Sequence, residues 1–196
     1  DECAQLYAAM LFDVIDQHAR AGGADLVLWC TPAEAAGFFA TRVPAGYRVL
    51  PQRGSILGAR LAAAFQIHAA EGYERIALRG TDSPTLPLAR VDTAFDALES
   101  TDLVLCPDHD GGYNLIALRS ACDALFEIEM STLAVLQQTR NQADRLGLRC
   151  SILPPHHDVD VISDLERIRG ELTAELTPRT LEWVDRWLER RAQSCL

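Results

Sequence analysis

Short apolar runs alternate with longer segments of helical spacing along most of this chain. Residues 2–21 place apolar side chains three and four positions apart, which predicts an amphipathic helix that Gly22 and Gly23 end. Six short apolar runs are typical of strands, several of them buried on both faces: residues 25–30, 47–50, 75–78, 102–106, 113–118 and 148–153. Helices are predicted at residues 33–41, 59–70, 89–98 and 131–146, with two more beginning near residues 163 and 177. Strands that alternate with helices predict an α/β fold around a mostly parallel, doubly wound sheet.

Two features depart from the usual form of such a sheet. Residues 113–118 follow residues 102–106 after only a few positions, whereas parallel strands need a long crossover, so we expect this strand to run antiparallel. The chain also begins in a helix, whereas doubly wound folds usually begin in a strand.

Composition narrows the classes of function. The 196 residues correspond to one domain, and no apolar run approaches the ~20 residues that a bilayer span needs, so no membrane partner is expected. A net charge of −10 with scattered basic residues argues against a nucleic-acid partner. The six cysteines form no CxxC pair, which favours free thiols in a reducing compartment, the cytoplasm.

An acidic turn follows the strand at residues 75–78. The segment 79–88, RGTDSPTLPL, places Asp82 at the carboxyl end of this strand, the sheet edge at which ligands bind in open α/β folds. A carboxylate there can hold a hard cation against a phosphate. Alternatively, Ser83 caps a helix with Pro84 at its first position, and Asp82 only supports the turn.

Two further acidic turns follow later strands. If the strands are parallel, Asp82 meets the Asp158 and Asp160 pair at one sheet edge, and two carboxylates suit Mg²⁺ or Mn²⁺. Such a cation neutralises the charge that develops on a diphosphate leaving group. The third turn, PDHDGGY, contains Asp110 and two glycines, which is also the composition of a simple hairpin turn. In the functional alternative the glycines let a ligand approach the backbone.

Five motifs together carry a resemblance to a known family. The segments LGARLAAAF, GTDSPTLP, DGGYNLIAL, MSTLAVLQQT and DVDVISDL, in this order and spacing, resemble the radical-SAM/selenodomain-associated transferases, bacterial proteins often labelled arsenosugar-biosynthesis glycosyltransferases. The chain is more distantly similar to phospholactate and molybdenum-cofactor guanylyltransferases. The resemblance extends to about Ile168 and implies a Rossmann-like GT-A fold, that of nucleotide-diphospho-sugar transferases, with helices on both faces of the sheet.

The resemblance also implies roles for individual residues. It places Asp82 and Asp160 at the metal, Asp110 as general base, Gln52, Gly58 and Arg60 at the nucleotide, and Gly111, Gly112, Tyr113 and Asn114 at the sugar or acceptor. The implied ligands are Mg²⁺ or Mn²⁺, a nucleotide or nucleotide-sugar donor, and a small acceptor. The leading hypothesis is glycosyl transfer from such a donor. The alternatives are nucleotidyl transfer with release of pyrophosphate, and a non-catalytic binding subunit of the same fold.

The sequence departs from the family pattern at its front. The family starts with a strand and a basic loop containing Lys-Thr-Arg-Leu, which is expected to hold phosphates, and no such segment precedes Asp1. Residues 1–196 are therefore expected to form a single domain that lacks its first strand and phosphate loop. Cys106 and Met130 also replace a glycine and a tryptophan that are usual in the pocket wall of the family. The substrate of the family therefore cannot be assigned to this chain.

Overall fold

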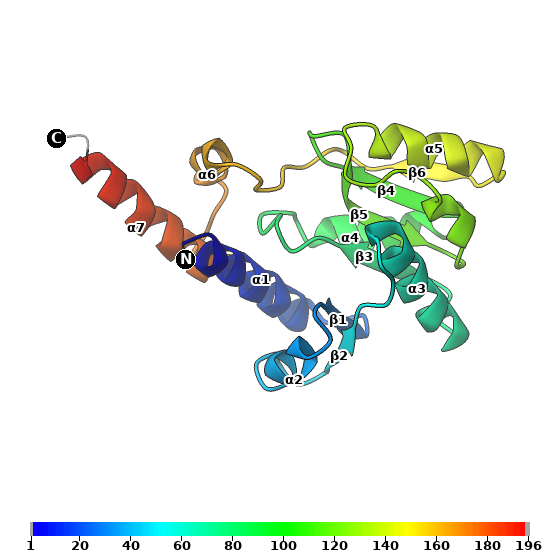
Figure 1. Cartoon of the computed structure of the whole chain (residues 1–196), viewed down its shortest axis with the longest axis horizontal. Helices are drawn as coiled ribbons and strands as arrows, with labels where there is room; N and C mark the ends of the chain where they lie inside the picture. The colour runs from blue at the N-terminus through cyan, green and yellow to red at the C-terminus, as the bar shows by residue number, and fades with distance from the viewer. Residues whose placement is uncertain (1, 195–196) are drawn as a thin grey trace.

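Helices and strands alternate through the computed structural model, which describes residues 2–194 (Figure 1). The helices are α1 (Glu2–Ala21), α2 (Ala35–Ala40), α3 (Leu57–Ala70), α4 (Ala89–Ala97), α5 (Val135–Arg145), α6 (Ile162–Ile168) and α7 (Pro178–Ser194), with a 3-10 turn η1 (Asp123–Phe126). The strands are β1 (Leu26–Cys30), β2 (Tyr47–Pro51), β3 (Ile76–Arg79), β4 (Leu103–Pro107), β5 (Tyr113–Leu118) and β6 (Cys150–Ile152). Each apolar run that predicted a strand therefore coincides with one to within two residues at either end.

The strands form two sheets. β1 and β2 pair in parallel, and the other four lie in the order β3-β5-β4-β6. β4 and β6 are parallel, while β5 is antiparallel to both of its neighbours, as the short connection predicted. Because β5 alone is reversed in this sheet, β3, β4 and β6 share one direction and end at the same edge.

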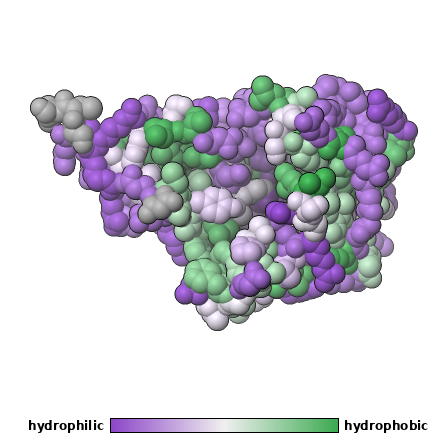
Figure 2. All heavy atoms as spheres, in the orientation of Figure 1, coloured by the Kyte–Doolittle hydropathy of each residue, from purple (hydrophilic) through white to green (hydrophobic). Residues whose placement is uncertain are grey.

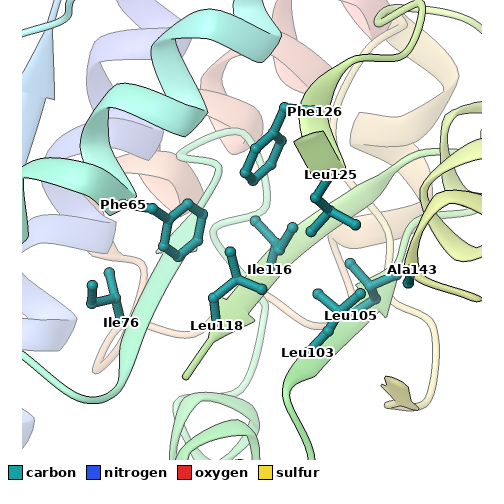
Figure 3. Packing of buried hydrophobic residues seen from close by; sticks show 9 residues of the cluster. All are labelled: Phe65, Ile76, Leu103, Leu105, Ile116, Leu118, Leu125, Phe126 and Ala143. Carbon is teal, nitrogen blue, oxygen red and sulfur yellow. The ribbon is translucent and has the colours of Figure 1, made fainter. Parts of the chain in front are cut away.

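Helices cover both faces of the four-stranded sheet. Figure 3 shows one face, where Phe65 of α3 and the η1 residues Leu125 and Phe126 pack on Leu105 and Ile116. The opposite face packs against α4 and the loop before it, through a second cluster: Leu86, Ala94, Leu98, Val104, Cys106, Leu115, Ala117 and Leu153. Each of these side chains is at most 7% exposed, so burial of apolar surface on both faces stabilises the sheet.

A third layer joins the two ends of the described chain. α1 packs along α7, and Figure 1 shows α7 at the opposite end of the molecule from α5. Asp13 of α1 is fully buried, where its carboxylate accepts hydrogen bonds from the Thr180 amide (2.8 Å) and hydroxyl (2.7 Å) and pairs with Arg179. Polar and apolar side chains intermix over the face in Figure 2. None of the helices in residues 2–194 combines the length and the apolar character that crossing a membrane takes.

One helix boundary differs from its prediction. The helix expected from residue 131 begins at Val135, because Ser131 has a φ of 62°, which a right-handed helix does not allow. The segment between them instead lies beside the cavity described next.

Candidate active site

A cavity of about 780 Å³ opens at the edge where β1, β3 and β4 end. All three acidic turns reach it, since Asp82, Asp108, Asp110 and Asp160 lie on its wall. Val159 donates its amide to the Asp82 carbonyl at 2.9 Å, which fastens two of these turns to each other. The convergence expected from parallel strands is thus present in the structure.

Three carboxylates form the tightest part of this acidic wall. One oxygen from each of Asp110, Asp158 and Asp160 lies within 4.8 Å of the others. The sequence left open whether Asp158 or Asp160 faces a metal, and the structure brings both into the cluster. Asp82 lies on the same cavity, and its charge acts on both of them.

The cluster is electrostatically unfavourable without a counter-ion. Burial raises the pKa of Asp158 to about 7, and the charges of Asp108, Asp160 and Asp82 contribute. The pKa of Asp160 is also raised, first by burial and then by Asp110 and Asp82. A hard divalent cation prefers carboxylate oxygens and would relieve this repulsion, so the donor set fits Mg²⁺ or Mn²⁺.

The raised pKa of Asp158 makes cation binding dependent on pH. Below pH 7 this carboxyl is mostly protonated in the free protein, and a bound cation must displace its proton. The affinity for Mn²⁺ is therefore expected to rise by up to about tenfold per pH unit from pH 5 to 7 and then to level off. Calorimetric titration measures this, and an Asp158→Asn variant should show a flatter dependence. An affinity of the wild-type protein that does not change over this range would contradict the assignment.

Proton binding by Asp158 also acts on the stability of the metal-free protein. Because its folded pKa is raised above the unfolded value, the folded state binds more protons between pH 4 and 7. The contribution of Asp158 to the free energy of unfolding is thus fully present at low pH, and it is lost as the pH rises through 7.

Gly80 lies against the Asp82 carboxylate and leaves space for it, because glycine has no side chain. A Cβ at position 80 would lie 2.4 Å from Oδ1 of Asp82, so a side chain there forces the carboxylate to turn. We expect Gly80→Ala to weaken Mn²⁺ binding several-fold while costing less than about 1 kcal/mol of stability, since only a flexible side-chain end must move. The matched control is Gly170→Ala, where an added Cβ meets nothing within 4 Å. Equal Mn²⁺ affinities for the two variants would show that the position of Asp82 does not matter.

The Asp-Gly-Gly loop joins β4 to β5 and is fixed from two sides. Asp108 Oδ1 accepts the amides of Asp110 (2.9 Å) and Gly112 (2.7 Å). Gly111 has a φ of 89°, and its carbonyl accepts the amide of Leu136 at 2.8 Å. The loop therefore connects an antiparallel pair, as the hairpin alternative expects, and also forms part of the cavity wall.

The next two predicted ligand residues line the same cavity. Asn114 is 4% exposed and donates its side-chain amide to the His156 carbonyl at 3.1 Å, while Oδ1 has no partner among the described residues. Tyr113 lies partly against the first core cluster. Burial raises the pKa of its phenol.

Of the three residues assigned to the nucleotide, only Gln52 lies on the cavity wall. Arg60 lies behind it and donates to Gln52 Oε1 at 3.3 Å and to the Gly54 carbonyl at 3.1 Å. Gly58 is buried, and a Cβ there would lie 2.7 Å from the Phe126 carbonyl, so close helix packing already requires a glycine.

Sequence reasoning missed Arg79. Its guanidinium donates to the carbonyls of Ser83 (2.6 Å) and Gly80 (3.2 Å) and so braces the turn that carries Asp82. Burial lowers its pKa to about 10. The sequence offered one signal for this role, a charged residue at the end of a predicted buried strand.

The helix-start alternative for this turn is wrong. Ser83 is fully buried, with no partner for its hydroxyl among the described residues, and α4 begins only at Ala89. Ser83 therefore caps no helix here.

Comparisons with known proteins give consistent matches. A family model described as "Uncharacterized protein conserved in bacteria (DUF2064)" matches residues 14–132, more than half of the chain. The phosphoenolpyruvate guanylyltransferase of Chloroflexus aggregans (strain MD-66 / DSM 9485) is 34% identical over 152 residues, which are 76% of this chain and 72% of that protein.

Solved structures show the same fold. A crystal structure described as a putative nucleotide-diphospho-sugar transferase, from Desulfovibrio desulfuricans G20, superposes with a TM-score of 0.85 at 29% identity, covering 95% of this chain and 83% of that one. The fold that the resemblance implied is thereby confirmed. Rv0371c from Mycobacterium tuberculosis H37Rv, in complex with manganese, is 21% identical with a TM-score of 0.51, covering 83% of this chain and 86% of that one, and shares the fold alone.

Proposed function

Since the chain belongs to the DUF2064 family of bacterial proteins, we propose that it is a divalent-cation-dependent nucleotidyltransferase that moves a guanylyl group from GTP to a small phosphorylated acceptor. The observation that carries this proposal is the carboxylate cluster of Asp110, Asp158 and Asp160 on the main cavity. The relative that is a phosphoenolpyruvate guanylyltransferase supports the choice of reaction and makes phosphoenolpyruvate the first acceptor to test.

The cavity has the size and lining that a nucleotide requires. Its volume of about 780 Å³ lies within the usual range for small-molecule sites. Leu57 and Leu61 of α3 offer an apolar wall, whereas the acids lie at the strand ends. A base therefore has apolar contacts at one side, while the phosphates meet the cation-binding side.

The proposed reaction exchanges one phosphoanhydride bond for another. An oxygen of the acceptor's phosphate attacks the α-phosphorus of GTP, the bond to the β-phosphate oxygen breaks, and pyrophosphate leaves with its electron pair. A divalent cation supplies charge neutralisation on the phosphates when it is bound. Asp110, Asp158 and Asp160 would hold it, and Asp82 would add negative charge beside it.

The acceptor's chemistry changes the role proposed for Asp110. A general base is needed for a hydroxyl acceptor, but a phosphate oxygen is already deprotonated at neutral pH. With a phosphorylated acceptor, Asp110 acts as a cation ligand, in line with its position beside Asp158 and Asp160. General-base action by Asp110 belongs to the glycosyl alternative.

Glycosyl transfer from a nucleotide-sugar to a small acceptor is the second candidate. The description of the Desulfovibrio structure favours it, as does the resemblance to arsenosugar-biosynthesis glycosyltransferases. A non-catalytic role is less favoured, because clustered acids destabilise a fold unless a ligand uses them.

The buried thiols of Cys30 and Cys106 fit a reducing, cytoplasmic setting.

Release of pyrophosphate separates the two reactions. The full-length protein is incubated with Mn²⁺, each nucleoside triphosphate in turn and phosphoenolpyruvate, and, separately, with a panel of nucleotide-sugars. We expect pyrophosphate from GTP that depends on both Mn²⁺ and the acceptor. Release of a nucleoside diphosphate from a nucleotide-sugar, without pyrophosphate from any triphosphate, would overturn the proposal in favour of glycosyl transfer.

A further inference from the structure

Gln17 of α1 is a polar side chain in the interior of the protein. It is only 3% exposed, and its Nε2 donates two hydrogen bonds, to the Pro84 carbonyl at 2.8 Å and to the Leu176 carbonyl at 2.9 Å. A primary amide has two N–H groups, so each of these carbonyls can receive one. Gln17 therefore joins three segments that are far apart in the sequence: α1, the turn that contains Asp82, and the segment before α7.

The two carbonyls depend on Gln17 for a hydrogen bond. Pro84 and Leu176 lie in turns, and among the described residues neither carbonyl accepts a backbone amide. A carbonyl oxygen only accepts, so the NH₂ group of Gln17, and not its Oε1, must face both of them. A buried carbonyl that loses its donor destabilises the arrangement that buries it, which here includes the turn at Pro84.

This turn is held by two side chains from other segments or positions. Arg79 donates to the Ser83 carbonyl at 2.6 Å, and Gln17 donates to the next carbonyl, that of Pro84. Neither Ser83 nor Pro84 lies on the wall of the main cavity, whereas Asp82 does. The two donors therefore fix the part of the turn that lies away from the cavity and leave the Asp82 carboxylate on its wall.

The position of the turn also acts on the carboxylate cluster. Val159 donates its amide to the Asp82 carbonyl at 2.9 Å, and Val159 lies between two of the clustered acids, Asp158 and Asp160. A displacement of the turn would therefore move Asp82 and these two acids relative to the rest of the site. Ligand distances to a cation vary by only about 0.2 Å, so a small displacement lowers the affinity.

Contacts between α1 and the C-terminal segments hold Gln17 in place. Asp13 precedes Gln17 by one helical turn, is fully buried and accepts the hydroxyl of Thr180 at 2.7 Å. Arg20 follows Gln17 and donates to the Glu175 carbonyl at 2.8 Å. α1 is thereby fixed on both sides of Gln17, so the amide reaches the turn from a defined position.

We propose that Gln17 is a positioning residue of the cation site. It does not contact the cation. It holds the turn that carries Asp82 and, through the Val159 amide, the segment of Asp158 and Asp160 in the arrangement that binds Mg²⁺ or Mn²⁺. The inference rests on the cation site of the proposed function and not on which group is transferred.

Gln17→Met in the full-length protein tests this role, because methionine has a similar length and no hydrogen-bond donor. We expect the variant to bind Mn²⁺ about tenfold more weakly or worse, measured by calorimetric titration at a temperature where it is fully folded. A purely structural side chain would lower the Tm without changing the affinity of the folded protein. An affinity equal to that of the wild type would therefore overturn the proposal.

Thr180→Val is the matched control. It removes a buried hydrogen bond to Asp13 from the same layer of α1 and α7, and neither residue lies on the main cavity. We expect a lower Tm and an unchanged affinity for Mn²⁺. A loss of affinity equal to that of Gln17→Met would assign the effect to loosening of the whole layer and would overturn the role of Gln17. A wild-type protein that binds no Mn²⁺ would instead refute the cation site itself.

The wild-type protein gives a second readout that does not depend on a folded variant. Coupling is reciprocal, so if the Gln17 hydrogen bonds favour the cation-binding arrangement, a bound cation favours these bonds to the same extent. Saturation with Mg²⁺, which is diamagnetic, is expected to slow hydrogen exchange of the Gln17 side-chain amide by about tenfold, as followed by NMR. Exchange that bound Mg²⁺ leaves unchanged would overturn the proposal.

Discussion

Asp160→Asn is expected to weaken Mn²⁺ binding by about 100-fold or more and to reduce pyrophosphate release by a similar factor. The change removes one of three clustered carboxylates and keeps the size of the side chain. Loss of even an outer partner of a metal site costs roughly 10–100-fold, so loss of a ligand should cost at least the upper value. Calorimetry with Mn²⁺ and a pyrophosphate assay measure the two effects.

The stability of this variant separates a site defect from misfolding. Burial, and then the charges of the neighbouring acids, raise the pKa values of Asp158 and Asp160. Removing the Asp160 charge takes away its burial cost and part of the repulsion, so the metal-free variant should have an equal or higher Tm at pH 8. Asp144→Asn, at an exposed position of α5, controls for the loss of a negative charge elsewhere. A variant that binds Mn²⁺ like the wild type would remove Asp160 from the proposed ligands.

Gly111→Ala is expected to lower the free energy of unfolding by about 3–5 kcal/mol. Two costs combine there. Its φ of 89° is one that L residues adopt at a cost of about 1–2 kcal/mol, and a Cβ would lie 2.1 Å from the Leu133 carbonyl oxygen. Since the clash is with backbone, it cannot be relieved by a rotamer change, and the segment before α5 must move.

Gly72→Ala measures the cost of a positive φ for an L residue without a steric clash. Gly72 has a similar φ of 95°, but an added Cβ meets nothing within 4 Å, so we expect a loss of only about 1 kcal/mol. Urea denaturation of the two variants measures the difference. Equal losses would show that the Leu133 carbonyl moves away from the added Cβ at no cost, which would contradict the expected backbone clash.

The sheet and the acidic edge were predictable because their signals are local. Each strand is a short apolar run, and strands of one direction end at one edge, which brought Asp82 and Asp160 to the same cavity. The reversal of β5 followed from the shortness of its connection to β4.

The features that escaped prediction depend on contacts between distant segments. Nothing near Gly58 in the sequence indicates that the Phe126 carbonyl lies against it. The bracing of the Asp82 turn by Arg79 depends on how the turn folds back, and the late start of α5 depends on the left-handed backbone of Ser131. Periodicity carries no information on such contacts.

The most direct test of nucleotidyl transfer follows the phosphorus atoms of GTP. The full-length protein is incubated with Mn²⁺, phosphoenolpyruvate and GTP labelled at either the α- or the γ-phosphate. We expect the α label to become attached to the acceptor while the γ label appears in pyrophosphate, and we expect Asp160→Asn to lower both by about 100-fold or more. An α label that remains in GTP or GDP, with the γ label absent from pyrophosphate, would contradict nucleotidyl transfer.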